Sequence, residues 1–165
     1  MHGNMVMSFV AVAAVLAGCQ STQHIKEPLP PPKNVTSGST FTVVKPFLVP
    51  SGDSSVYFQD TRLYPQGEIQ SNYPYCQFVT GRANGAGEII GEQTFTVVNV
   101  EYDEQGAGPK GMDGSVTDIH LQAASSDQAY RLNCLLPFPS QAAVFITPAE
   151  IQGVVGGYME LKVAP

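Results

Sequence analysis

The chain has 165 residues, of which 43% are hydrophobic and 13% are charged, and its formal net charge is −6. This length suits one domain with appendages, and the hydrophobic content is sufficient for a buried core. The excess of acid argues against non-specific nucleic-acid binding, which needs Lys and Arg to neutralise phosphates. Only three histidines are present, which leaves little material for metal or acid–base chemistry. We predict no metal site and no cofactor.

An apolar run occupies residues 5–17 near the N-terminus, and Gly18 and Cys19 follow it directly. The run is shorter than the about 20 residues that a membrane-spanning helix needs, but it has the length of the hydrophobic region of a secretory signal. A buried apolar helix that ends in Gly-Cys is the alternative. The Gln-, Ser- and Thr-rich stretch that follows favours the secretory signal.

The tetrapeptide Leu16-Ala17-Gly18-Cys19 resembles the lipobox of bacterial lipoproteins. The resemblance implies that the signal is cleaved before Cys19 and that this residue receives acyl chains. Gln20 at the next position implies sorting to the cell outer membrane in that family. Several acyl chains give stable membrane anchoring without a spanning segment.

Residues 20–40 are rich in Ser, Thr, Gln, Asn and Pro and include Pro30, Pro31 and Pro32. Prolines in series favour an extended polyproline II conformation, which is typical of a spacer. A proline-rich ligand for a partner is the alternative. We therefore expect a signal peptide at 1–18, a lipidated cysteine and flexible tether at 19–40, and a single β-rich periplasmic domain at 41–165.

Two cysteines, Cys76 and Cys134, remain if Cys19 is lipidated. Export places them in an oxidising compartment, where two such residues tend to pair. Alternation puts Cys76 on the strand face of Phe78, and Cys134 on the strand face of Leu132, so both should point into the core. The sequence lacks a Cys-x-x-Cys motif and a histidine beside either cysteine, which favours a structural disulfide over a redox-active or metal-binding pair.

The remainder of the domain is predicted to be mainly strands, because Val, Ile, Thr, Tyr and Phe form short runs between Gly, Pro, Asn, Asp and Ser. The expected strands are residues 41–49, 55–60, 75–80, 94–102, 116–123, 130–136 and 158–163. The apolar phase shifts between Val97 and Val98, which indicates a bulge or burial on both faces. Residues 125–128 are expected to form a hairpin loop.

One helix is expected near the C-terminus, at residues 148–155. Thr147 is a capping residue, Pro148 suits the first helical position, and Glu150 completes a capping box. Its apolar face is formed by Ile151, Val154 and Val155. These elements predict an antiparallel sandwich or partly open barrel with one short C-terminal helix packed on it and a final strand.

The domain also resembles small Gram-negative envelope lipoproteins with no assigned activity. The resemblance lies in residues 75–78, 131–134 and 147–155 and covers most of residues 41–163. It implies a fold and a disulfide, and it carries no catalytic residue across.

Three features of the sequence are candidate sites of chemistry. Residues 106–111 match G-x-G-x-x-G, but the internal Pro109 and the lack of a following helical pattern indicate a flexible loop rather than a nucleotide site. Acidic residues gather near this loop, and we expect a solvated or partner-facing surface rather than a calcium site. His120 and Asp118 lie on the polar face of one predicted strand, where a surface histidine is expected; a hydrolase is the alternative.

We therefore expect a non-enzymatic, outer-membrane-anchored lipoprotein that acts through protein interaction or assembly in the periplasm. The candidate partner surface consists of Tyr57, Tyr64, Tyr73, Glu101, Asp103 and Glu104. The alternatives are a small-ligand binder with an apolar pocket between sheet and helix, and a hydrolase that uses His120.

Overall fold

The computed structural model describes residues 34–65, 67–81, 87–103, 107–108, 112–137 and 145–165. The chain divides into two units, Met1–Pro30 and Pro31–Pro165, and every described residue belongs to the second. The expected signal peptide and most of the expected tether lie outside the described residues. Within the described part, no helix is long and apolar enough to cross a membrane.

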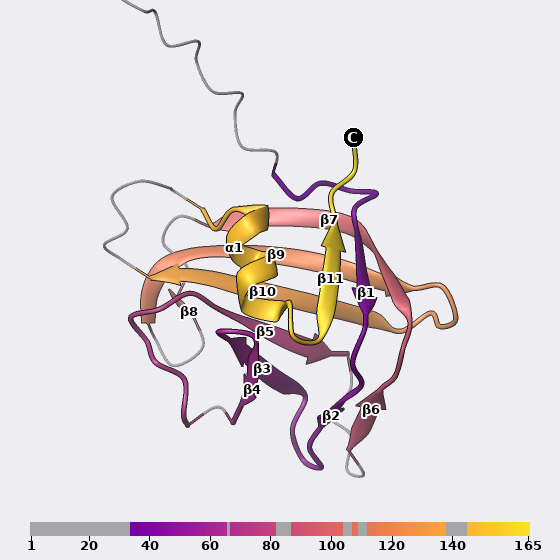
Figure 1. The fold of residues 1–165 in the computed structure, drawn as a ribbon, viewed down its shortest axis with the longest axis horizontal. Helices are drawn as coiled ribbons and strands as arrows, with labels where there is room; N and C mark the ends of the chain where they lie inside the picture. The colour runs from indigo at the N-terminus through magenta and orange to yellow at the C-terminus, as the bar shows by residue number, and fades with distance from the viewer. Residues whose placement is uncertain (1–33, 66, 82–86, 104–106, 109–111, 138–144) are drawn as a thin grey trace, which may run out of the picture. The chain divides into compact units, whose positions relative to one another are not determined.

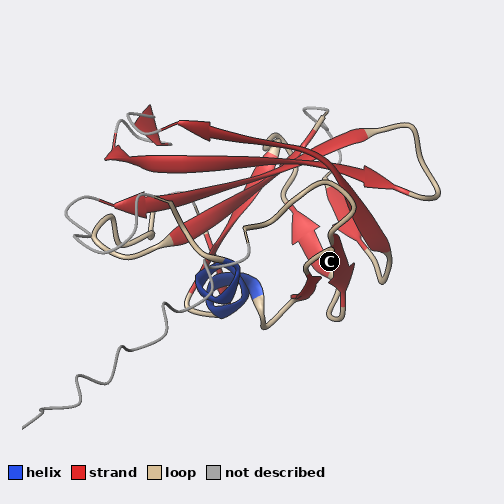
Figure 2. Ribbon diagram, turned by 90° about the horizontal axis from the view of Figure 1, so that it is seen from above, coloured by secondary structure: helices blue, strands red, loops and turns tan. Residues whose placement is uncertain are grey.

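The main sheet is antiparallel and curled, with the strand order β11-β1-β7-β9-β10-β5-β3-β4, and β8 is added to β9 (Figures 1 and 2). Its strands are β1 (Thr40–Val43), β3 (Ser55–Gln59), β4 (Arg62–Tyr64), β5 (Tyr75–Thr80), β7 (Thr94–Asp103), β8 (Ala107–Gly108), β9 (Met112–Ala123), β10 (Ala129–Pro137) and β11 (Met159–Lys162). A small second sheet pairs β2 (Phe47–Val49) with β6 (Glu88–Ile90). The predicted β class, in its partly open barrel form, is confirmed.

The core lies on the concave side of the sheet, where alternate residues of neighbouring strands point inward. Phe41, Phe78, Phe95, Ile119 and Leu132 come from five different strands and are all fully buried. Alternation with a period of two residues explains how strands that carry polar residues at every other position build one apolar face.

A disulfide joins the neighbouring strands β5 and β10 in the interior of the sheet. Cys76 and Cys134 lie directly opposite each other in the strand register and are bonded, as the sequence predicts. Both residues are fully buried in the core beside Phe78 and Leu132. The bond therefore fixes the pairing of two strands that are distant in the sequence.

Replacing both half-cystines, as Cys76→Ala with Cys134→Ala, should lower the free energy of unfolding. The bond spans a sequence separation of 58 residues, and loop-closure entropy assigns such a cross-link about 4 kcal/mol. Urea denaturation of the variant and of the oxidised protein measures the difference. A loss below about 1 kcal/mol would show that the bond adds little beyond the packing of β5 on β10.

Helix α1 (Pro148–Val155) packs on the open side of the curled sheet and contacts β3, β5 and β11 (Figure 1). Its capping box is present as predicted: the Glu150 amide donates to the Thr147 hydroxyl, and the Thr147 amide donates to the Glu150 carboxylate. Ile151, Val154 and Val155 are buried. Gly156 caps the C-terminal end in a right-handed conformation.

The turn between β3 and β4 contacts the C-terminal end of α1. Asp60 and Thr61 both have positive φ, of 50° and 61°, which is the geometry of a tight hairpin turn. The Thr61 amide donates to the Val154 carbonyl at 3.0 Å. A Cβ at Gly157 would collide with the Thr61 carbonyl oxygen, so a glycine is required there for close approach.

Gly157→Ala should therefore destabilise the protein by more than about 1 kcal/mol, because the turn must separate from the helix. Gly153→Ala is the matched control: a Cβ there meets open space, and alanine in a helix is more stable than glycine by about 0.5–1 kcal/mol. Thermal unfolding of the two variants should give shifts of opposite sign. Equal shifts would contradict the close approach.

The exposed edge of β11 is closed by one side chain of the helix. The Gln152 amide nitrogen donates to the Met159 carbonyl at 3.1 Å, and its oxygen accepts from the Leu161 amide at 2.7 Å. These backbone groups face away from β1. An edge strand that is hydrogen-bonded in this way offers less of a template for pairing with another chain.

The strand predictions differ from the structure in detail. Residues 41–49, expected as one strand, form β1 and β2, because the chain bends over residues 44–46, where Pro46 has no amide hydrogen to donate. The short strands β4, β6 and β8 were not predicted. The bulge is confirmed, since the register of β7 on β9 shifts between Val97 and Asn99, and the predicted hairpin loop joins β9 to β10.

Candidate functional site

The convex face of the sheet holds a group of three titratable residues that we term the acid–histidine cluster: Glu101, Asp118 and His120. Nε2 of His120 lies 3.6 Å from Oε1 of Glu101 and 3.8 Å from Oδ2 of Asp118. Arg131 on the next strand places a guanidinium nitrogen 3.2 Å from the same Asp118 oxygen. Asp118 and His120 therefore lie on the polar face of β9, as predicted.

The bulge in β7 is what brings Glu101 to this face. Before the shift, Phe95 and Val97 point into the core; after it, Asn99 and Glu101 occupy the phase that points outward. The shift aligns Asn99 with His120 and Glu101 with Asp118 across the strands. Bulges commonly re-aim side chains in this way.

The predicted partner surface is divided by the fold. Tyr57 is only 3% exposed, so its inclusion as a contact residue is corrected: it packs on the convex face in a small cluster with Tyr75 and Leu135. Glu101 and Asp103 are exposed on β7. Glu104 lies outside the described residues.

Tyr64 and Tyr73 both line a surface hollow of about 360 Å³ between the β3–β4 hairpin and α1. Tyr73 is 55% exposed and Tyr64 is half-buried. We term this site the tyrosine hollow; its other lining residues are Gln59, Asp60, Gln70, Pro74, Glu150, Gly153 and Val154. The Gln59 side chain fixes one wall, because it donates to the Gln70 carbonyl and accepts from the Gln70 amide.

An apolar pocket between sheet and helix was the alternative expectation; at the side of α1 the described residues form a surface hollow with polar and apolar walls. The inward-facing side of α1 packs against the core without an open pocket at these positions, since Ile151 and Val155 are fully buried. Alternation along the chain could not reveal the hollow, because its walls come from a hairpin, a loop and a helix.

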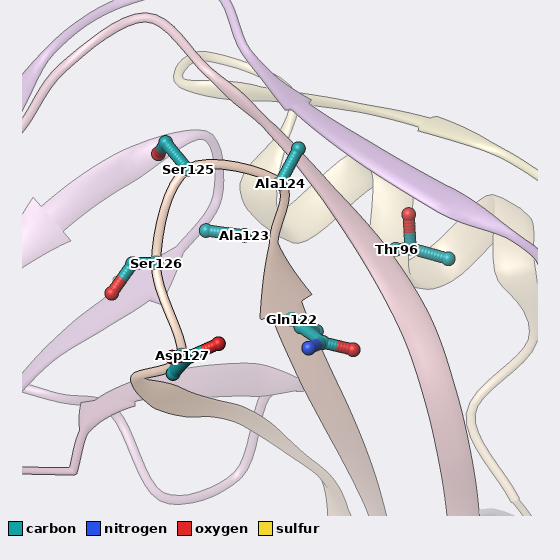
Figure 3. Close-up of a pocket in the computed structure, with 7 residues that line it drawn as sticks. All are labelled: Thr96, Gln122, Ala123, Ala124, Ser125, Ser126 and Asp127. Carbon is teal, nitrogen blue, oxygen red and sulfur yellow. The ribbon is translucent and has the colours of Figure 1, made fainter.

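Two further hollows flank the convex face. One, of about 360 Å³, lies at the β9–β10 hairpin and is drawn in Figure 3; Thr96 and Gln122 line it from the strands, and Ser125 and Asp127 from the loop. The other, of about 380 Å³, includes His120, Arg131 and Val79. Neither was predicted from the sequence.

The G-x-G-x-x-G stretch is not followed by a helix. Ala107 and Gly108 form β8, which pairs with Asp113 and Met112 of β9, and β9 continues as a strand. The remaining residues of the stretch lie outside the described residues. A dinucleotide fingerprint needs the turn between a strand and a helix, and this part of the chain has a strand in the helix position.

Burial raises the pKa of two tyrosines on the convex face, Tyr75 and Tyr57. Burial raises the pKa of Tyr75 well above its usual range, and the neighbouring Tyr57 adds to this shift. Burial also raises the pKa of Tyr57, against the opposing effect of hydrogen bonds with Ser55 and Gln77. The Gln77 amide donates to the Tyr57 hydroxyl at 3.0 Å.

The raised pKa of Tyr75 predicts a loss of stability in alkali. The unfolded chain releases its phenol proton near pH 10, below the pH at which the folded protein does, so the free energy of unfolding should fall as the pH rises above about 10. Tyr75→Phe should reduce this fall. Urea denaturation of the wild type and of the Tyr75→Phe variant at about pH 9 and pH 11 measures the fall in each protein; equal falls in the two would contradict the burial argument.

No protein-family model matches the sequence, and comparisons with curated proteins and with solved structures also find no significant match. The function is therefore inferred from the residues of the chain and the geometry of its domain.

Proposed function

We propose that the chain is an outer-membrane lipoprotein whose β domain acts in the periplasm through contact with another envelope protein, without enzymatic activity. The resemblance of Leu16-Ala17-Gly18-Cys19 to a lipobox supports the anchoring, and the tyrosine hollow is the observation that carries the contact. Tyrosine is enriched at the centres of protein interfaces because it supplies a large, rigid surface at low entropic cost.

The chemistry of the hollow favours a basic group on the partner. Asp60 and Glu150 line it beside the two tyrosine rings, and no Lys or Arg is among the described residues that form its walls. A lysine or arginine side chain would gain both carboxylate attraction and contact with an aromatic face. The net charge of −6 further favours a basic partner surface.

Site-specific photo-crosslinking in cells tests this proposal. A photoreactive benzophenone residue at Tyr73 should give a discrete crosslink to one envelope protein, and the same residue at Val98, which is 47% exposed on β7, should not. Asp60→Asn should weaken the crosslink severalfold, because it removes the charge while asparagine tolerates the positive φ of this turn. Equal crosslinking at Tyr73 and Val98 would contradict the proposed surface.

The anchoring is tested in the same strains. Cys19→Ser should leave the protein as a precursor outside the outer-membrane fraction and abolish the Tyr73 crosslink. A Cys19→Ser protein that still matures and fractionates with the outer membrane would contradict the lipoprotein assignment, whatever the crosslinking shows.

A small ligand is the second candidate occupant of the hollow, because its volume of about 360 Å³ falls within the range of ligand sites. Gly153→Leu would place a side chain at the hollow. A small molecule retained by the wild type in native mass spectrometry and lost in this variant would favour the ligand. The hydrolase hypothesis remains a prediction without support from the contacts of Nε2 of His120, which faces two carboxylates.

A further inference from the structure

Buried polar atoms without hydrogen-bond partners are concentrated on one patch of the convex face. Among the described residues, four side-chain atoms are buried and lack such a partner. Three of them belong to neighbouring positions of β9 and β10: Oδ1 of Asp118, Nε2 of His120 and Oδ1 of Asn133, which lies opposite Asp118. Buried polar groups normally have partners, so this concentration makes the patch a candidate site for a polar or ionic ligand.

The placement of the imidazole supports this interpretation. About a third of the His120 side chain is exposed (32%), yet its Nε2 atom is buried, because it points between the carboxylates of Glu101 and Asp118. These two acids face each other directly across β7 and β9. Like charges in that position destabilise a sheet, and a cation between them would remove the repulsion.

The spacing matches what a single metal ion requires. Two ligand atoms bound about 2.1 Å from a tetrahedral ion lie about 3.4 Å apart. Nε2 of His120 lies 3.6 Å and 3.8 Å from the two carboxylate oxygens. One ligand atom from each of the three residues lies within 4.8 Å of the others. Small side-chain rotations would therefore complete the set.

We propose that Glu101, Asp118 and His120 bind a divalent transition-metal ion such as zinc. An imidazole with two carboxylates is a donor set for zinc and its neighbours in the first transition row, whereas calcium and magnesium prefer oxygen alone. Three protein ligands leave a fourth position for water. This proposal is independent of the tyrosine hollow, which is built from other residues.

Arg131 is the charged competitor of the ion, and the Asn99 side chain, whose Nδ2 donates to Oε1 of Glu101 at 2.9 Å, is a neutral one. The Arg131 guanidinium contacts Oδ2 of Asp118 at 3.2 Å, which neutralises part of the charge that would attract the ion. The Arg131 side chain is 47% exposed, so it can turn toward water when the ion binds. Removing the Arg131 guanidinium should therefore strengthen metal binding. If the Arg131–Asp118 ion pair served the structure alone, its removal would not raise the affinity for metal.

The test uses the full chain with His2→Asn, Cys19→Ser and His24→Asn, which removes the other histidines and the remaining free thiol. Zinc is titrated by calorimetry, and cobalt by absorption and by NMR of the single imidazole, that of His120. We expect one ion per chain, and a shift of the His120 ring signals at the same equivalence point. Acid should release the ion, because protons compete for the ligands.

The variants separate a site from non-specific binding. His120→Asn and Glu101→Gln should each weaken zinc binding by about tenfold or more, Arg131→Gln should strengthen it, and Asp127→Asn should leave it unchanged. Circular dichroism confirms that each variant is folded. Absence of binding at millimolar zinc, equal binding by the His120→Asn variant, or equal affinity for calcium would each overturn the proposal.

Discussion

The register of β5 against β10 is fixed by a covalent bond in the core of the domain. The disulfide between Cys76 and Cys134 joins residues that are directly opposite, so it fixes the register of these strands as well as their proximity. A slip of one residue would exchange the two faces of a strand. The fixed register places Phe78 beside Leu132 in the core, and on the convex face it sets Asn133 opposite Gln77.

The two edge strands of the curled sheet, β11 and β4, do not pair with each other, so other contacts must stabilise them. Helix α1 packs on the open side, and the Gln152 side chain satisfies backbone groups of β11 that face away from the sheet. The β3–β4 turn contacts the end of the same helix through Thr61, at a distance that only glycine at position 157 permits. The tyrosine hollow lies beside this junction, so the contacts that close the fold also shape the proposed partner surface.

The parts of the fold predictable from the sequence are those in which local pattern and burial agree. Strand β5 and the capping box of α1 appear at the predicted residues, because alternation and helix capping depend on neighbours in the chain. The burial of Tyr57 was not predictable, since Ile69 packs against its cluster from a loop that the Gln59 side chain holds through the Gln70 backbone, eleven residues away. The meeting of Glu101 with His120 depends on the exact place of a bulge, which the sequence indicated without giving its consequence for the opposite face.

If the disulfide-bonded pair β5 and β10, together with β9, organises the fold, these strands should be the most stable part of the domain. Native-state hydrogen exchange tests this directly, because amides in the last segment to open exchange only through global unfolding. We predict the slowest exchange at the inter-strand amides of β5, β9 and β10, with faster exchange in β4 and β11. Slowest exchange in β1 and β11 instead, or unchanged protection of β5 after reduction of the disulfide, would contradict this organising role.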